Sequence, residues 1–321
     1  MKDHKPLGIK LLTSEMLKKY EGVQSALGDT LQSINKEGFK HSRGHLGINV
    51  GDPQSYGLFK EYFDEVLKEI HPNIDCSYKP FDGSILQDKT NSYRVRLARN
   101  VKGFPLPPAM TSTDRLKLLE KVETVVQSLG EKYIQYKDLD HPSNEENLPS
   151  WYFFSKGDEY YDTSGLNNDW PVGRSVFYFS EMHCVLWVGE EDHLRVFCHQ
   201  QEGDFLTTFT NASNLASQLE QALGFCKSDD LGYLTTCPTN LGTGMRISIH
   251  YKLPHGVSIE KIQELAKPLS LSIRGTNGER SESIGGIVDI SNTYRHSKAP
   301  EEFFHYTWSS ICNLIQDVEV L

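Results

Sequence analysis

The sequence lacks the segments that mark membrane and secreted proteins. No stretch approaches the roughly 20 apolar residues of a membrane-spanning helix, and the first residues have no apolar run like that of a signal peptide. The 321 residues include 43 Asp and Glu against 33 Lys and Arg, a formal net charge of -10. This charge opposes non-specific binding to nucleic acid or anionic membranes. We therefore expect a cytoplasmic protein with no nucleic-acid or membrane partner.

Several short motifs for metals and phosphates are also missing. The six cysteines are irregularly spaced without a Cys-x-x-Cys pair, and no His-Glu-x-x-His occurs. This spacing predicts free, reduced thiols and no metal held by protein ligands. No Gly-Lys-Ser/Thr follows a glycine-rich turn, and the His-Arg-Asp and Asp-Phe-Gly motifs of protein kinases are absent. The charge of any bound phosphate must therefore be neutralised by cations other than the lysine of a phosphate-binding loop.

Residues 1–75 have helical patterns and little strand signal. Thr13 or Ser14 can cap a helix that starts at about Glu15. A second helix is predicted after Asp52-Pro53, with one apolar stripe formed by Phe59, Phe63, Val66, Leu67 and Ile70. These patterns predict a small all-α domain. The Pro, Asp, Gly and Ser of residues 73–87 indicate a linker after it.

Residues 88–321 alternate between strand and helix patterns. In Tyr93–Leu97 two arginines share one face and Val95 takes the other. Helices are predicted over 114–129, capped by Ser112 or Thr113, and over 205–223. The predicted strands are 175–179, 184–188, 194–199, 231–236 and 245–253. Short polar turns between them predict an α+β domain with an antiparallel sheet flanked by helices.

The segment Cys237-Pro-Thr-Asn-Leu-Gly-Thr-Gly-Met-Arg246 combines a thiol, a glycine-rich turn and a guanidinium. Glycine lets the backbone approach a ligand closely, and the fork of Arg246 suits phosphate or carboxylate. By spacing alone, a tight turn with a buried cysteine beside a surface arginine explains it equally well.

The segment resembles the active-site cysteine signature of the phosphagen (ATP:guanidino) kinases. Four further blocks match that family in order: Gly51–Tyr56, Asn91–Arg96, Trp187–Arg195 and Ile273–Glu279. The resemblance spans nearly the whole chain and is greatest to arginine kinases. It implies an all-α guanidine-specificity domain (1–75), an α+β catalytic domain that binds ATP (88–321), and reversible transfer of the γ-phosphoryl group of Mg-ATP to a guanidino compound.

The resemblance also implies roles for individual residues. Mg²⁺ would be bound through ATP phosphates and water, with no protein ligand. Cys237 would be a thiolate of lowered pKa that orients the substrate. Asp192 and His250 could orient the waters of the ion or be structural. The nucleotide (ATP or ADP) would be held by Arg94, Arg96, Arg195, Arg246 and Arg274, the guanidinium by Glu191 and Glu279, and the specificity segment would be Gly44, Leu46, Gly47, Ile48 and Asn49.

The acceptor is the least constrained part of this interpretation. Glu279 favours L-arginine, but Gly242-Thr-Gly244 is closer to creatine kinases, and taurocyamine stays open. Residues 275–286 are expected to form a closing loop, poorly ordered without ligand. Departures from the family pattern occur at Trp151, Gly189 and 178–183.

Rival interpretations are a protein-arginine kinase and a catalytically inactive nucleotide-binding relative. The helical domain argues against the first, because protein-arginine kinases lack it, and the complete set of arginines, glutamates and Cys237 argues against the second. Either a monomer or a homodimer is compatible with the sequence.

Overall fold

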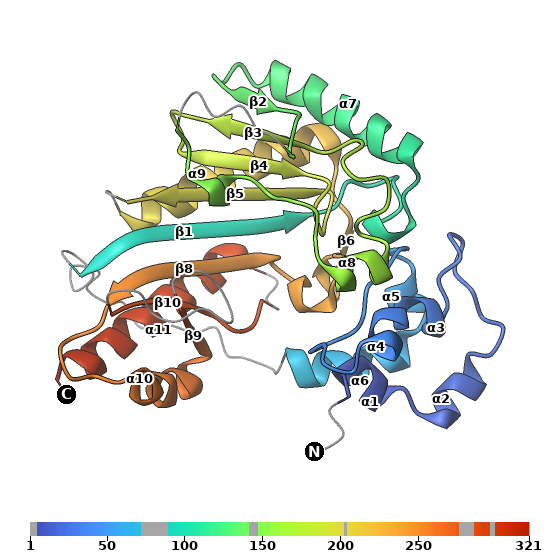
Figure 1. The fold of residues 1–321 in the computed structure, drawn as a ribbon, viewed down its shortest axis with the longest axis horizontal. Coiled ribbons are helices and arrows are strands. Elements are labelled where there is room, and N and C mark those ends of the chain that lie inside the picture. The colour runs from blue at the N-terminus through green and yellow to red at the C-terminus, as the bar shows by residue number, and fades with distance from the viewer. Residues whose placement is uncertain are drawn as a thin grey trace.

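A computed structural model describes residues 5–71, 89–140, 147–201, 204–275, 286–295 and 299–320. A small helical part precedes a larger part built on an antiparallel sheet (Figure 1). The predicted α+β fold class is therefore confirmed, whereas the predicted linker lies outside the described residues. No described helix is long and apolar enough to cross a membrane.

The small part has its own apolar centre. Thr13 caps α2 as predicted, because its hydroxyl accepts a hydrogen bond from the Met16 amide (3.2 Å). The helix predicted after Asp52-Pro53 is divided at Phe59, which leaves the helical conformation yet stays buried with Phe63. The helices are α1 Leu7–Leu11, α2 Ser14–Lys19, α3 Leu31–Ile34, α4 Lys36–Lys40, α5 Ser55–Leu58 and α6 Lys60–Ile70.

The larger part contains an eight-stranded sheet of order β2-β3-β4-β5-β1-β8-β10-β9, with every neighbouring pair antiparallel. The long strand β1 lies in its middle and ends beside the small part (Figure 1). The strands are β1 Thr90–Arg99, β2 Ile134–Tyr136, β3 Ser175–Phe179, β4 Cys184–Val188, β5 Leu194–Gln200, β8 Met245–Lys252, β9 Leu271–Gly275 and β10 Ile287–Asn292.

The main core fills one face of this sheet. Val95, Ile247 and Ile290 point into it from three adjacent strands, and helices cover it. Thr111 caps α7 through a capping box with Asp114, so the predicted caps Ser112 and Thr113 are wrong by one or two residues. The covering helices are α7 Ser112–Ser128, α9 Phe205–Leu223, α10 Ile259–Ala266 and α11 Pro300–Glu319.

Two predictions about the larger part need correction. The predicted strand 231–236 is reduced to β7 Gly232–Tyr233, which pairs with β6 Lys227–Ser228 in a separate ribbon and forms bridges to Gly242. The expectation of free thiols is wrong for Cys184 and Cys198, which form a disulfide. They face each other across β4 and β5, a register that their separation of 14 residues did not reveal.

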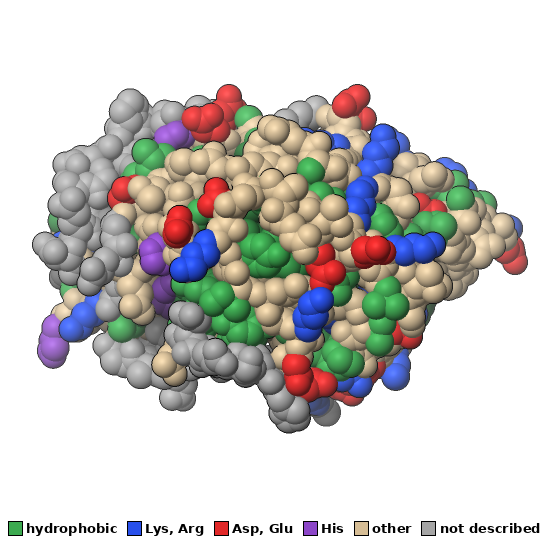
Figure 2. All heavy atoms as spheres, turned by 90° about the horizontal axis from the view of Figure 1, so that it is seen from above, with side chains coloured by type: hydrophobic (Ala, Val, Ile, Leu, Met, Phe, Trp, Pro, Cys, Tyr) green, Lys and Arg blue, Asp and Glu red, His purple; other side chains and the backbone are tan. Residues whose placement is uncertain are grey.

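The surface mixes charges of both signs. On the face seen in Figure 2, acidic and basic side chains are interspersed, and no large patch of one sign covers its described residues. The basic residues with functional predictions gather on the sheet face opposite the main core.

Candidate active site

Antiparallel register places the predicted arginines on one face of the sheet. Arg96 on β1 lies opposite Arg246 on β8, and Ala98, two residues on, lies opposite Arg195 on β5. Asp289 on β10 lies opposite both His250 and Arg274. Side chains of residues directly opposite one another on neighbouring strands point to the same face of the sheet, and along one strand every second side chain does so too. Arg94, Arg96, Arg195, Arg246 and Arg274 therefore form an arginine face, opposite the face packed by the main core.

Asp289 holds two of these guanidinium groups. Its Oδ2 atom accepts from Arg94 Nη2 and from Arg246 Nη2, each at 3.0 Å, while Oδ1 is buried without a partner among the described residues. Burial lowers the pKa of Arg246 to about 10, with Asp289 opposing and Arg274 adding to the decrease. Burial, followed by Arg195 and Arg246, also lowers the pKa of Arg96. Positive charge is thus concentrated beyond what one carboxylate neutralises, which favours a polyanionic ligand.

An acidic turn lies at the edge of the arginine face. Arg195 Nη1 pairs with Glu190 Oε2 at 2.6 Å and its Nη2 with Glu191 Oε2 at 3.0 Å. Asn240 Nδ2 donates to the same Glu191 oxygen at 3.1 Å. Burial raises the pKa of Glu191, with Arg195 opposing. Burial also acts on Arg195, but Glu190 and Glu191 outweigh it and raise its pKa. The turn therefore offers a fixed carboxylate next to a permanent cation.

Tyr161 on α8 (Glu159–Ser164) supports this turn from the side of the small part. Its hydroxyl donates to Glu190 Oε1 at 3.2 Å, and burial raises its pKa well above 10, so it remains a donor. His41, which follows α4, hydrogen-bonds Thr163 and packs on Tyr160 (ring centroids 4.6 Å apart). Helix α8 thus joins the small part to the acidic turn.

Cys237 lies close to the acidic turn, but the pKa of its thiol is shifted in the direction opposite to the prediction. Burial, then the Glu191 carboxylate, raises the pKa of its thiol to about 12. Its Sγ atom lies 3.0 Å from Thr239 Oγ1. Arg295, the nearby cation, has a smaller effect, so the expectation of a thiolate is wrong for this structure.

The predicted specificity segment is mostly packed inside the small part. Ile48 is 1% exposed, and Asn49 Nδ2 donates to Glu37 Oε2 at 2.6 Å. Gly47 has φ +74°, and a Cβ there would lie 2.6 Å from Gly38 Cα, so it needs glycine. Leu46 is buried too, and Gly44 lies beside Tyr160 of α8. The described contacts assign these residues to packing, and their predicted role in binding stays a prediction.

Glu279 and the loop predicted over 275–286 fall mainly in residues 276–285, outside the described residues. Asp192 accepts hydrogen bonds from Asn100 Nδ2 (2.7 Å) and the Thr236 amide (2.8 Å). These two bonds support its structural interpretation. His250 Nδ1 lies 3.0 Å from Ser92 Oγ, on the arginine face.

Two departures from the family pattern have local explanations. Gly189 adopts φ +79°, a conformation that glycine takes without strain. Trp151, in the 3₁₀ turn Ser150–Tyr152, is 38% exposed and packs edge-on against His199, with ring centroids 4.4 Å apart. His199 lies opposite Arg94, which places this aromatic surface beside the arginine face.

The geometry agrees with the comparisons with known proteins. The model of the ATP:guanido phosphotransferase C-terminal catalytic domain matches residues 117–319, and that of the N-terminal domain matches residues 2–68.

The chain belongs to the ATP:guanido phosphotransferase family. It is 32% identical over 310 residues to an arginine kinase of Anthopleura japonica and 32% identical over 311 residues to a taurocyamine kinase of Schistosoma mansoni. These matches cover 91% and 89% of this chain but only 43% and 40% of those proteins, so the chain spans less than half of their length. The arginine kinase of Penaeus japonicus, also 32% identical, is covered over 87% of its length.

Solved structures of this family share the fold. A lombricine kinase superposes with a TM-score of 0.87 at 26% identity, covering 99% of this chain and 93% of that one. A substrate-free duplicated taurocyamine kinase from Schistosoma mansoni gives 0.86 at 28% identity, covering 98% of this chain and 47% of that one. The family resemblance drawn from the five motif blocks is confirmed.

Sequence reasoning did not identify Asp289, Arg295 or Tyr161 as site residues. Arg295 Nη1 donates to the Thr239 carbonyl (3.1 Å) and contacts Asn240 Oδ1, so it fixes the loop that carries Cys237. Asp289 is 43 residues from Arg246 and 195 from Arg94, and only the strand order brings them together. A lone acidic residue in an apolar strand segment, as in Ile287–Asn292, was the one available signal.

Proposed function

We propose that the protein is a phosphagen kinase that reversibly transfers the γ-phosphoryl group of Mg-ATP to a guanidino compound, with L-arginine as the favoured acceptor. The observation that carries this proposal is the arginine face, which meets the carboxylate of Glu191 at Arg195. A cationic surface and an adjacent carboxylate suit a polyphosphate donor and a cationic acceptor, respectively. A cytoplasmic location and a monomeric or homodimeric state belong to the same proposal.

The arginine face would bind the nucleotide phosphates. One guanidinium group can contact two phosphate oxygens at once. A bound polyanion would also favour the protonated forms of Arg96 and Arg246. Asp289 would keep Arg94 and Arg246 in place until the phosphates arrive. Trp151 and His199 would present an aromatic surface to the base.

Mg²⁺ would be held by the nucleotide. Among the described residues no cluster of three or more His, Cys, Asp or Glu side chains could hold a metal ion. The donors on the arginine face are cationic, which fits an ion that arrives on phosphate oxygens and water. When bound, it would supply neutralisation of charge on the transferred group.

Glu191 and Glu279 would align the guanidinium, and Glu191 would accept the proton lost as the N–P bond forms. Arg195, held by Glu190 and Glu191, would lie between donor and acceptor. Cys237 would contact the acceptor as a thiol that becomes more acidic when a guanidinium adjoins it, because a nearby cation favours the thiolate.

Arginine is favoured by Glu279 and by the relatives named arginine kinase. Taurocyamine is the alternative, supported by the similarity to the taurocyamine kinase of Schistosoma mansoni. Glycine at position 244, with φ +59° and a Cβ that would lie 2.7 Å from the Ala98 carbonyl, is required by the turn. It is therefore a poor indicator of the creatine branch.

The test is ADP release from Mg-ATP with arginine, taurocyamine, lombricine, glycocyamine and creatine in turn. We expect turnover with arginine that is lost in Arg246→Met, while Lys117→Met on the exposed side of α7 keeps it. Turnover with only one of the other compounds would show that this compound, and not arginine, is the acceptor. No turnover with any compound supports the inactive relative and refutes the proposal.

A further inference from the structure

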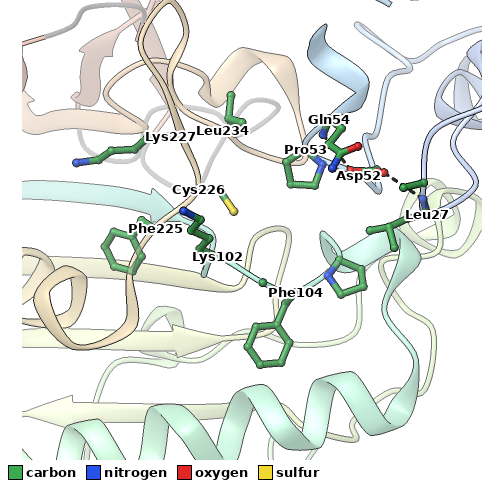
Figure 3. A pocket seen from close by; sticks show the side chains of 13 residues that line it. Leu27, Asp52, Pro53, Gln54, Lys102, Phe104, Phe225, Cys226, Lys227 and Leu234 are labelled. Atoms are coloured by element: carbon green, nitrogen blue, oxygen red, sulfur yellow. Dashed lines mark hydrogen bonds between the residues drawn. The ribbon is translucent and has the colours of Figure 1, made fainter. Parts of the chain in front are cut away.

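A pocket of about 550 Å³ lies where the small part meets the larger one (Figure 3), and its described lining includes none of the predicted site residues. Leu27 and Pro53 reach it from the small part, and Phe104, Cys226 and Leu234 from the larger part. Its volume falls within the range of small-molecule sites, roughly 300 to 1,000 Å³.

The walls of this interdomain pocket are largely apolar, and most of its polar groups are already paired. Asp52 accepts from the amides of Leu27 (3.1 Å) and Gln54 (2.9 Å). Lys227 forms an ion pair with Glu220 and lies over the Tyr233 ring, 4.4 Å from its centroid.

Lys102 differs from these groups. It lines the pocket and is exposed, and its ammonium has no ion-pair partner among the described residues. Figure 3 shows its side chain beside that of Cys226. The pocket therefore offers one ammonium without a described ion-pair partner above an apolar surface, and its acidic group, Asp52, is held by two backbone amides.

We propose that the interdomain pocket is a second ligand site, which binds a small apolar monoanion such as an aromatic carboxylate. The ring would lie against Leu27, Phe104 and Leu234, and the carboxylate would meet Lys102. A polyphosphate fits poorly, because one free ammonium faces it while the Asp52 carboxylate lines the same pocket.

The pocket wall is joined to the acidic turn by a short chain of hydrogen bonds. The Leu234 amide donates to the Cys226 carbonyl (3.0 Å), and the Cys226 amide donates to the Asn100 carbonyl (2.8 Å). Asn100 Nδ2 in turn donates to Asp192 Oδ1 at 2.7 Å, next to Glu191. A ligand that displaces this wall would thus change the position of the acidic turn, and its binding would be coupled to that of the acceptor.

Calorimetric titration with 1-naphthoate and with the uncharged 1-naphthamide tests the site itself. We expect naphthoate to bind with a dissociation constant on the order of 0.1 to 1 mM, as expected for so small a ligand. The unmodified protein should bind naphthamide about three- to five-fold more weakly than naphthoate. Lys102→Met should weaken naphthoate binding by the same factor, which corresponds to the free energy of an exposed ion pair. Lys117→Met, an exposed lysine on α7, is the matched control and should bind like the unmodified protein.

Two further variants locate the bound probe. Leu27→Trp, at a side chain 48% exposed, fills the pocket and should abolish naphthoate binding without affecting thermal unfolding. Arg246→Met removes a cation from the arginine face and should leave naphthoate affinity unchanged. Naphthoate binding that survives Leu27→Trp, that ignores Lys102→Met, or that is lost in Arg246→Met overturns the proposed site, as does no binding at all.

The coupling rests on the proposed function and has its own measurement. The naphthoate dissociation constant is determined with and without a saturating amount of the acceptor that the substrate panel identifies. We expect the acceptor to change the naphthoate dissociation constant by at least about two-fold. If naphthoate shifts the acidic turn and so alters acceptor binding, the acceptor must alter naphthoate binding by the same factor. An unchanged constant overturns the coupling alone. The titrations without acceptor do not depend on turnover, so failure of the proposed function is distinguishable from failure of the pocket.

Discussion

Glu191→Gln is the substitution that most directly tests the proposed chemistry. The amide keeps the shape of the side chain, and its oxygen can still accept from Asn240 and Arg195. What is lost is the negative charge that would face the proposed acceptor. A carboxylate and a guanidinium about 4 Å apart attract by roughly 4 kcal/mol at an effective dielectric constant near 20. We therefore expect kcat/KM for the acceptor to fall about 10³-fold, within the roughly 10²- to 10⁴-fold typical of a lost general base.

The assay is steady-state ADP release between about pH 5 and pH 9, with the folded fraction checked by thermal unfolding. Burial raises the pKa of Glu191, so the active carboxylate form is lost as pH falls through a value above that of an ordinary glutamate. If the proposed function is correct, the unmodified protein should therefore lose activity on the acid side at an unusually high pH. In Glu191→Gln that acid limb should disappear.

Glu190→Gln is the comparison that distinguishes charge from position. Glu190 is adjacent and also pairs with Arg195, but its other oxygen is bound to Tyr161. We expect this variant to weaken nucleotide binding and to keep the acid limb. If kcat/KM of Glu191→Gln stays within about ten-fold of that of the unmodified protein and Glu190→Gln removes the acid limb, the assignment of the base to Glu191 is wrong.

Three further predictions follow from the same contacts. The raised pKa of Cys237, about 12, predicts that its alkylation in the ligand-free protein accelerates with each pH step from 7 to 10, and a plateau near neutral pH would contradict that raised pKa. Tyr161→Phe should raise the KM for ATP about three- to ten-fold and lower the free energy of unfolding by about 1 kcal/mol, because Glu190 loses a donor; Tyr160→Phe is the control, and equal effects of the two would refute the role. Asp289→Asn should lower the free energy of unfolding by about 2–4 kcal/mol, since Arg94 and Arg246 lose their shared carboxylate; calorimetry with Mg-ATP should show a larger stabilisation than in the unmodified protein, and an equal one would count against phosphate binding there.

Local patterns predicted those parts of the fold whose signals are complete within one segment. Helix α9 begins and ends as predicted, because Asp204 caps it and Gly224 follows its last turn. Strand β1 alternates arginines with Val95, and this alternation predicts the correct faces because Val95 and its neighbours on that face are buried in the core. Each of these features is decided by residues within about 20 positions.

Features that depend on register or on distant packing were not predictable. Residues 231–236 have a strand-like composition, but Leu234 and Thr236 are buried against the small part and the acidic turn, not in the sheet. The Tyr56 hydroxyl, from the small part, donates to the carbonyl of Thr235 at 2.7 Å. The pairing of Cys184 with Cys198 depends on a strand register in the same way.

The difference between the predicted and observed environment of Cys237 shows why motif position alone does not fix a pKa. The motif places a cation near the thiol, and the structure supplies one in Arg295, yet burial and Glu191 act in the opposite direction and outweigh it. Arg295 also acts on Glu191, whose pKa burial raises. A guanidinium entering between Glu191 and Cys237 would reverse the balance for both groups, because it favours the charged form of each. Under the proposed function, the acceptor would add a further cation beside Arg195 and Arg295, and its binding would promote ionisation of both groups.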